Sequence, residues 1–179
     1  MQAGNHKVLV TGASGFYGRH LVPFLRASGY EPLAMMRRDV SFGNSIKVIK
    51  IGDIAGTDIA RHLDGVDAIV HLLGLAHFIP VADYDRVNRE STKRVAQAAK
   101  NAGAKLIYIS SIAAQSGPSS DQMLVESGPL VPTTSYGRSK LAAEPTSPPR
   151  PTTPRSTAYS LIGRIALRQA ALSGLAKMS

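Results

Sequence analysis

The sequence contains no cysteine, so neither a disulfide bond nor a zinc site with thiolate ligands is available to it. No apolar run reaches the roughly 18 residues that a membrane-spanning helix needs. Residues 1–6 form a short polar segment that leads directly into an apolar stretch, which does not fit a secretory signal peptide. We therefore expect a cytoplasmic protein that does not enter a membrane.

Acidic residues are absent from residues 145–179, which carry five of the 21 lysines and arginines. More than half of the formal net charge of +9 lies there, because residues 1–144 hold 16 basic and 12 acidic residues. A nucleic-acid-binding surface needs a basic stripe with interleaved aromatic residues, and the sequence has none. The mild positive excess of residues 1–144 instead suits a small anionic ligand.

Proline is concentrated in one place, since five of the 11 prolines lie in residues 145–154. Proline fixes φ and removes an amide donor, so the helical pattern that begins at residue 136 cannot continue through this stretch. Beyond it, residues 159–175 show weak helical periodicity. The character of the chain therefore changes near Glu144.

Short apolar runs and helical patterns alternate along residues 7–143. Strands are expected at residues 7–11, 31–36, 45–51, 68–73 and 106–110. Helical segments are expected at residues 20–27, 59–63, 85–102 and 136–143. The run AIVHLL is almost entirely apolar, as is typical of a parallel strand covered on both faces. This order predicts an α/β fold with a doubly wound parallel sheet and right-handed crossovers.

A glycine-rich segment, TGASGFYG, lies between the first expected strand and the first expected helix. Gly12 permits a tight turn, Gly15 lets the backbone approach a diphosphate without an intervening Cβ, and Gly18 allows the helix to pack closely on the strand. The free amides at the start of the helix, with the positive end of its dipole, favour an anion. The segment predicts a dinucleotide-binding site rather than a generic turn. Its candidate cofactor-binding residues are Gly12, Ser14, Gly15, Phe16, Tyr17 and Gly18.

These glycines are each three residues apart, a spacing that resembles the short-chain dehydrogenase/reductase family rather than other dehydrogenases. Within that family, TGASGFYGRHL is similar to the extended, NAD(P)-dependent epimerase/dehydratase branch. The resemblance covers roughly residues 7–144 and implies an NAD(P)-binding Rossmann domain over residues 1–144. Residues 145–179 form an atypical tail rich in proline and arginine, with no recognisable substrate domain and no recognisable sixth strand.

Two arginines follow the second expected strand, at the place where such enzymes select their cofactor. A carboxylate there accepts hydrogen bonds from the ribose 2′-hydroxyl and repels a 2′-phosphate, but this chain has Met36. Arg37 and Arg38 instead offer guanidinium groups that suit a phosphate. We therefore expect NADP in preference to NAD, the alternative being that both arginines are solvated loop residues.

The resemblance assigns further cofactor contacts after the third and fourth expected strands. It places Asp53 and Ile54 beside the adenine, although Asp53 is equally suited to cap a helix. It places Leu73 and Gly74 along the ribose and diphosphate, with Gly74 allowing close backbone approach. Asn88 matches a family asparagine that supports the site from the next helix.

The segment YGRSK places a phenol, Tyr136, and an ammonium group, Lys140, four residues apart on one helix face. A phenol is a poor base at neutral pH because its ordinary pKa is about 10, and a neighbouring cation stabilises the phenolate. In the resembled family such a tyrosine removes a hydroxyl proton while hydride moves to the nicotinamide, and the lysine also binds the ribose. The alternative is that Tyr136 and Lys140 are an ordinary surface pair one helical turn apart, with no catalytic role.

A third candidate catalytic residue, Ser111, follows the fifth expected strand, where open α/β sheets bind their ligands. We expect its hydroxyl to hold a substrate carbonyl or hydroxyl group. Many relatives carry this hydroxyl one place later, where this chain has Ile112, so the exact serine and the reaction subtype stay open.

Together these residues predict an NAD(P)-dependent oxidoreductase, epimerase or dehydratase that uses no metal and acts on a small molecule, which the resemblance suggests is a nucleotide sugar. Two alternatives stay open: a non-catalytic NADP-binding or sensor protein, and an inactive fragment of such an enzyme. The oligomeric state also stays open, a homodimer being one option.

The break after Glu144 leads to the hypothesis that the tail is an out-of-frame or truncated end of a longer reading frame. Loss of a substrate region would leave a sheet edge and apolar surface uncovered. We then expect weak or absent turnover and poor solubility, with cofactor affinity partly retained.

Overall fold

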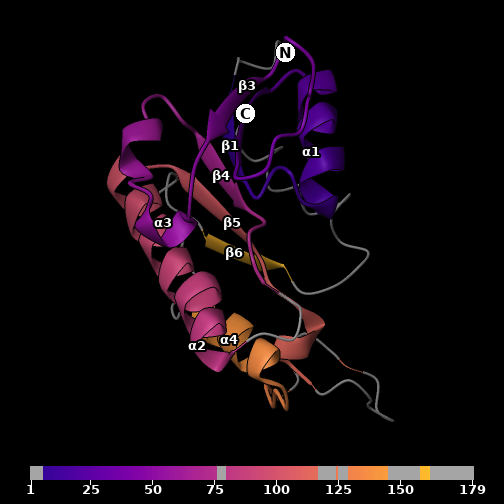
Figure 1. Ribbon diagram of the computed structural model, residues 1–179, viewed down its shortest axis with the longest axis vertical. Helices are drawn as coiled ribbons and strands as arrows, with labels where there is room; N and C mark the ends of the chain where they lie inside the picture. The colour runs from indigo at the N-terminus through magenta and orange to yellow at the C-terminus, as the bar shows by residue number, and fades with distance from the viewer. Residues whose placement is uncertain (1–5, 76–79, 117–123, 125–128, 145–157, 162–179) are drawn as a thin grey trace.

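Six parallel strands form a single sheet in the computed structural model, which describes residues 6–75, 80–116, 124, 129–144 and 158–161 (Figure 1). Their order across the sheet is β3-β2-β1-β4-β5-β6, so the chain winds outward from β1 in both directions. The doubly wound α/β fold expected from the sequence is confirmed. The strands are β1 (Lys7–Thr11), β2 (Glu31–Met36), β3 (Lys47–Lys50), β4 (Ala68–His71), β5 (Lys105–Ile109) and β6 (Ala158–Leu161).

The central strands are buried on both faces. All four residues of β4 are buried, and β1 is buried from Val8 to Thr11. β4 pairs with β1 in the register Val8 to Ala68, which brings the carboxyl ends of both strands to the same edge of the sheet. That edge is where a doubly wound sheet places its ligands.

Two helical layers cover the sheet, with α1 (Phe16–Ala27) on one face and α3 (Ser91–Ala102) on the other (Figure 1). Val22 and Leu25 of α1 pack with Val8 and Val10 of β1 in one core cluster. The second cluster lies on the opposite face and contains Val95 and Ala99 of α3 with Leu9 and Ile69. Alternation along β1 therefore supplies both cores from one strand.

The helix expected at residues 85–102 is longer and less regular than the pattern suggested. It begins as α2 (Val81–Tyr84), continues as the π-helix η3 (Asp85–Glu90) and ends as α3. Ser91 Oγ donates to the Val87 carbonyl and Thr92 Oγ1 donates to the Asn88 carbonyl (2.5 Å), and such side-chain bonds compete with the regular helical pattern. The hydrophobic periodicity of the sequence does not reveal this change from α-helix to π-helix.

Shorter helical segments complete the described structure. The helix expected at residues 59–63 is a single 3₁₀ turn, η2 (Ala60–His62). Two further 3₁₀ turns follow β3 and β5, namely η1 (Ile54–Gly56) and η4 (Ile112–Ala114). α4 (Ser135–Ala143) begins one residue before the expected start and packs beside α2 (Figure 1). Within the described ranges no helix is long and apolar enough to cross a membrane.

The expectation that the chain has no sixth strand is wrong. Residues 158–161 form β6, which pairs in parallel with β5 in the register Leu106 to Ala158. Residues 159–161 are therefore part of a strand, whereas the sequence pattern suggested that a helix begins at residue 159. The edge of β5 is therefore paired. A segment of four residues is too short to show the alternating pattern of a strand in the sequence. It forms a strand because its backbone pairs with the edge of β5. Residues 145–157 and 162–179 lie outside the described part, so the proposed tail stays a prediction.

The contact of α1 with the start of the glycine turn depends on Gly18 having no side chain. A Cβ added at Gly18 would lie 2.4 Å from the carbonyl oxygen of Ala13. We expect Gly18→Ala to lower the free energy of unfolding by about 1–3 kcal/mol, because the backbone of α1 must move away from β1. Chemical denaturation measures the change.

The matched control is Gly56→Ala, because a Cβ at Gly56 meets nothing within 4 Å. This variant should stay within about 0.5 kcal/mol of the wild-type chain. Equal stability of the two variants would contradict the close helix–strand packing.

Candidate functional site

A cleft of about 400 Å³ opens at the carboxyl ends of β1, β2, β3 and β4. Its volume falls within the range of roughly 300–1,000 Å³ that is usual for ligand sites. The residues that line it follow directly after these four strands or come from η3: Gly12, Ser14, Gly15, Arg37, Arg38, Gly52, Asp53, Ile54, Leu72, Leu73, Gly74, Leu75, Arg86 and Val87.

Gly12 is the point where the turn after β1 meets the segment after β4. Its φ is +71°, in the left-handed region, and an added Cβ would lie 3.0 Å from the amide nitrogen of Leu73. The Gly15 amide donates to the Gly12 carbonyl (2.9 Å), and the Ala13 amide donates to the Met35 carbonyl (3.1 Å). These contacts hold the turn in one conformation before any ligand arrives.

The start of α1 faces this turn without a side-chain cap. Gly15 is its N-cap residue and, having no side chain, cannot satisfy the first amides of the helix. Arg19 Nε donates to the Ser14 carbonyl (3.0 Å), which fixes the turn from the helix side. Uncapped amides and the positive end of a helix dipole form a favourable site for a diphosphate.

The remaining residues of the glycine segment do not line the cleft. Phe16 is 74% exposed and packs edge-to-face against Tyr17 and His20. Gly18 is buried against Ala13 and serves the packing of α1. The segment therefore divides into a ligand-facing part, Gly12 to Gly15, and a part that anchors the helix.

The position after β2 carries charge but no carboxylate. Met36 is 1% exposed and packs in the core cluster beneath α1, so its side chain is directed away from the cleft. Arg37 and Arg38 are exposed and line the cleft. A ribose bound at this position would meet guanidinium groups.

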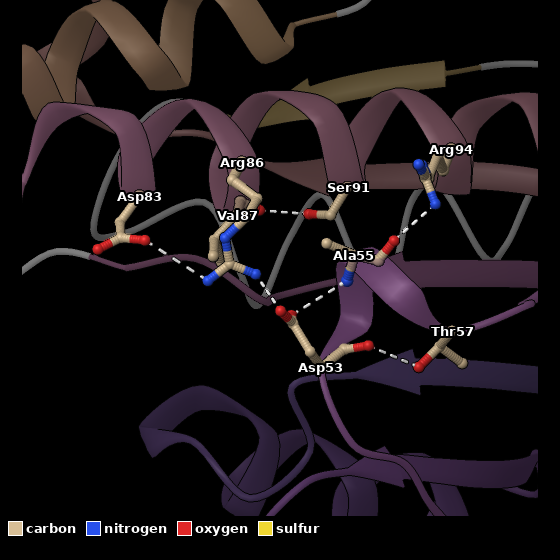
Figure 2. A network of polar contacts seen from close by, with 8 residues as sticks. All are labelled: Asp53, Ala55, Thr57, Asp83, Arg86, Val87, Ser91 and Arg94. Atoms are coloured by element: carbon tan, nitrogen blue, oxygen red, sulfur yellow. Dashed lines mark hydrogen bonds and ion pairs between the residues drawn. The ribbon is translucent and has the colours of Figure 1, made fainter.

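Asp53 lies on the cleft wall after β3 and caps η1, which confirms the capping alternative, while its contact with an adenine stays a prediction. Its carboxylate accepts from the Ala55 amide (3.2 Å) and is ion-paired with Arg86 of η3 (Figure 2). The pKa of Asp53 is lowered from its ordinary value, mainly by the Ala55 amide; burial opposes this effect, and the Arg86 and Arg37 guanidinium groups lower the pKa further. The carboxylate is thus ionised at neutral pH.

Asn88 joins the cleft to α4. It is 1% exposed, and its side-chain oxygen accepts from the Leu75 amide (2.7 Å) while its Nδ2 donates to the Leu75 carbonyl (3.0 Å) and to Ser139 Oγ (2.9 Å). A Cβ added at Gly74 would lie 3.4 Å from Asn88 Oδ1 and 3.6 Å from Lys140 Nζ. Gly74 also lines the cleft, so the Lys140 ammonium group lies close behind this part of the cleft wall.

Lys140 is buried, with 4% of its surface exposed. Its Nζ donates to the carbonyl of Ile109 at the end of β5 (2.7 Å) and lies 4.3 Å from the centre of the Tyr108 ring. Burial lowers the pKa of Lys140 to about 8, against the opposing effect of the Glu144 carboxylate. The ammonium form therefore still prevails at pH 7.

His71 lies beneath this lysine and is fully buried. Its Nδ1 is hydrogen-bonded to Thr11 Oγ1 (2.6 Å) and its Nε2 to Thr92 Oγ1 (3.1 Å). Burial, and secondarily Lys140, lower the pKa of His71 to about 3, so the ring is neutral at physiological pH. The histidine links β1, β4 and α3 and has no access to the cleft.

Tyr136 and Ser111 lie at the ends of α4 and β5, outside the lining of the cleft. Tyr136 is half-buried, with its ring centre 6.1 Å from that of Tyr84. Ser111 caps η4, its Oγ accepting from the Ala113 amide (3.2 Å). A Cβ added at Gly137 would lie 2.0 Å from the Ala113 carbonyl oxygen, so the residue after Tyr136 packs directly on η4, which begins after Ser111.

Comparison with protein families gives a match over residues 8–146 to the NAD dependent epimerase/dehydratase family. The chain belongs to this family. The resemblance inferred from the glycine spacing and the segment TGASGFYGRHL is confirmed.

This chain covers only part of the length of individual family members. A ceramide reductase from Caulobacter vibrioides is 37% identical over 112 residues, which are 60% of this chain and 35% of that protein. A UDP-glucose 4-epimerase from Azospirillum brasilense is 28% identical and covers 79% of this chain and 44% of its own length. The solved structure of MoeE5 in complex with UDP-glucuronic acid and NAD is 34% identical, with a TM-score of 0.70, over 76% of this chain and 46% of that one. The chain thus spans less than half the length of these proteins.

Sequence reasoning missed three residues that contribute to this site. Arg86 and Val87 line the cleft from η3, although the pattern suggested only Asn88 from this segment. The signal in the sequence is their position directly before Asn88. The strand pattern explains Tyr108 only as a residue of β5, yet its ring supports the Lys140 ammonium.

The burial of Lys140 makes a pH-dependent contribution to stability. Its folded pKa of about 8 is below the ordinary 10.5, so between these values the unfolded chain binds the proton and the folded chain does not. The free energy of unfolding contributed by this group should therefore rise with pH across that window, by at most about 3 kcal/mol. We expect the stability of the wild-type chain relative to Lys140→Met to increase by this amount between pH 7 and pH 10.5.

Denaturant unfolding at a series of pH values measures the difference. Lys47→Met, which replaces an exposed lysine of β3, is the control and should show no such rise relative to wild type. A wild-type advantage over Lys140→Met that stays flat or falls with pH would show that the lysine is not buried as described.

Proposed function

We propose that the chain binds NADP in the cleft, with the diphosphate over the turn Gly12 to Gly15. The observation that carries this proposal is the meeting of the positive-φ Gly12 with Leu73 beside the uncapped start of α1. A side chain at Gly12 would fill the space against Leu73. The adenosine end would then lie toward Asp53 and Ile54, and the nicotinamide end toward Gly74 and Lys140.

The preference for NADP rests on the side chains after β2. Met36 replaces the carboxylate that would accept hydrogen bonds from a ribose 2′-hydroxyl, and its burial leaves the position without an acceptor. Arg37 and Arg38 provide positive charge at the same wall. MoeE5 is described with NAD, so this chain would differ from it in cofactor choice.

The reacting groups would be Ser111, Tyr136 and Lys140. A nicotinamide cofactor, when bound, supplies the hydride acceptor or donor. The Lys140 ammonium, held by the Ile109 carbonyl, would lower the cost of a negative charge on the Tyr136 oxygen. Tyr136 would take the proton from a substrate hydroxyl, and Ser111 would donate a hydrogen bond to the same substrate oxygen.

A nucleotide sugar is the proposed substrate, and residues 1–144 are the proposed NAD(P)-binding unit. The support is the kinship with a UDP-glucose 4-epimerase and with MoeE5, which is described with UDP-glucuronic acid. Whether the reaction is an epimerisation, a dehydration or a simple oxidoreduction is part of this proposal and not fixed by the shared fold.

A ceramide-type lipid is the second candidate substrate. The relative with the highest identity of those named above is a ceramide reductase. In addition, Ile112 stands directly after Ser111 and is 49% exposed, so it offers an apolar contact next to the proposed substrate-binding hydroxyl. Turnover assays with UDP-sugars and with a ceramide in mixed micelles separate the two candidates.

Binding without turnover is the remaining alternative, and Tyr136→Phe distinguishes it from catalysis. We expect this variant to lose at least about 100-fold in turnover, the usual contribution of a general acid–base group, while its affinity for NADPH stays within about twofold of wild type. Nicotinamide fluorescence measures binding, and change of absorbance at the nicotinamide band measures turnover.

Two results would contradict the enzymatic proposal. One is wild-type binding of NADPH and NADH with no turnover of any substrate class, which would favour a sensor role. The other is equal turnover by wild type and Tyr136→Phe. Tyr84→Phe is the matched control, since Tyr84 contacts Tyr136 and should leave the chemistry in place.

A further inference from the structure

The adenosine end of the cleft contains a carboxylate in a position that opposes a phosphate. Asp53 lines the same cleft as Arg37 and Arg38, and the Arg37 guanidinium is close enough to act on its charge. A free carboxylate there would pair with Arg37 and repel a further anion. A site that accepts a phosphate at this wall must therefore neutralise Asp53 by another group.

Arg86 of η3 is placed to do so. Its Nη1 is ion-paired with Asp53 Oδ2, and its Nη2 lies 3.5 Å from Asp83 Oδ1 (Figure 2). The guanidinium thus bridges two carboxylates with its two ends, the geometry for which arginine is better suited than lysine. The ion pair also joins two separate segments of the cleft lining, because Asp53 follows β3 and Arg86 belongs to η3.

The Asp53 side of this pair is fixed independently. Its carboxylate accepts from the Ala55 amide, its carbonyl accepts from Thr57 Oγ1 (2.8 Å), and Arg94 of α3 donates to the Ala55 carbonyl (2.6 Å) (Figure 2). Asp53 therefore has little freedom to turn toward Arg37. A cation must therefore come to the Asp53 carboxylate in this position to neutralise its charge.

Among the described residues, the two arginines after β2 form no ion pair within 4 Å, although the Arg37 charge still acts on Asp53. Asp39, the next residue, is ion-paired with Lys50 (2.8 Å). Two solvated guanidinium groups next to a neutralised carboxylate form a site with net positive charge.

We propose that Arg86 is a specificity-determining residue, which takes up the Asp53 carboxylate and so leaves Arg37 and Arg38 available to a phosphate on the adenosine ribose. This inference rests on the proposed preference for NADP. It adds a residue from η3 to a selection otherwise attributed to the loop after β2.

The test compares two small probes that differ only in the relevant group, adenosine 2′,5′-bisphosphate and adenosine 5′-monophosphate. The ratio of their affinities isolates the 2′-phosphate and cancels losses common to both. For the full wild-type chain we expect the bisphosphate to bind more tightly. Arg86→Gln should reduce this ratio by about three- to fivefold, the range expected of a half-exposed ion pair.

A second substitution reveals whether the effect passes through Asp53. In Arg86→Gln combined with Asp53→Asn the ratio should return to within about twofold of wild type, because asparagine removes the repelling charge and still caps η1. Arg86→Lys keeps the positive charge and should retain most of the ratio. Arg94→Gln is the matched control, since it loses a bond of the same network and leaves the Arg86–Asp53 pair intact.

Each outcome decides the inference. A ratio unchanged in Arg86→Gln overturns it and leaves the NADP preference standing. A reduced ratio that Asp53→Asn does not restore also overturns it, because Arg86 would then bind the phosphate itself. A wild-type chain that binds both probes equally overturns the NADP preference and this inference together.

Discussion

The contact between the backbones of Gly12 and Leu73 is the constraint on which the rest of the site depends. Because Gly12 lacks a side chain, the turn after β1 lies directly against the segment after β4. The parallel register of β1 and β4 brings both segments to the same edge of the sheet, and the start of α1 then faces the cleft without a capping side chain. A narrow cleft with exposed amides follows from these three facts, without any specific polar side chain.

A second contact of the same kind connects the cleft to the proposed reacting groups. A side chain at Gly74 would touch both Asn88 and Lys140, and Asn88 holds both Leu75 and Ser139 of α4. The lysine itself is held by a strand carbonyl and an aromatic ring. Since these groups are buried, their positions are set by packing, and α4 cannot shift without disturbing the cleft wall. The π-helix η3 supplies both Asn88, directed inward, and Arg86, directed to Asp53.

Much of this arrangement could be predicted from local sequence patterns. β1 and β2 have the expected bounds, because short apolar runs between turn residues specify buried parallel strands. The ligand-facing half of the glycine segment, the two arginines and Asp53 all line the cleft, since each stands directly after a strand of known order. The topology of a doubly wound sheet therefore carries this information from sequence to site.

What could not be predicted depends on contacts between distant segments. β6 exists through its pairing with β5, and four residues hold no periodic signal of their own. The π-helical turn arises where two hydroxyl groups bind backbone carbonyls, and only the folded helix reveals that Arg86 reaches Asp53. Tyr108 was likewise readable only as an apolar residue of a strand until α4 was seen to place Lys140 over its ring.

The most direct measurement is a calorimetric titration of NADPH into the wild-type chain and into Gly15→Val. A Cβ at Gly15 would lie 3.1 Å from the Gly12 carbonyl oxygen, and the branches of valine would cover the amides at the start of α1. Our account predicts a measurable heat of binding for the wild type and none for Gly15→Val at the same concentrations, with unchanged far-ultraviolet circular dichroism. Gly56→Val, away from the cleft, should bind as the wild type does. Equal binding by Gly15→Val, or no binding by a folded wild-type chain, would contradict the account.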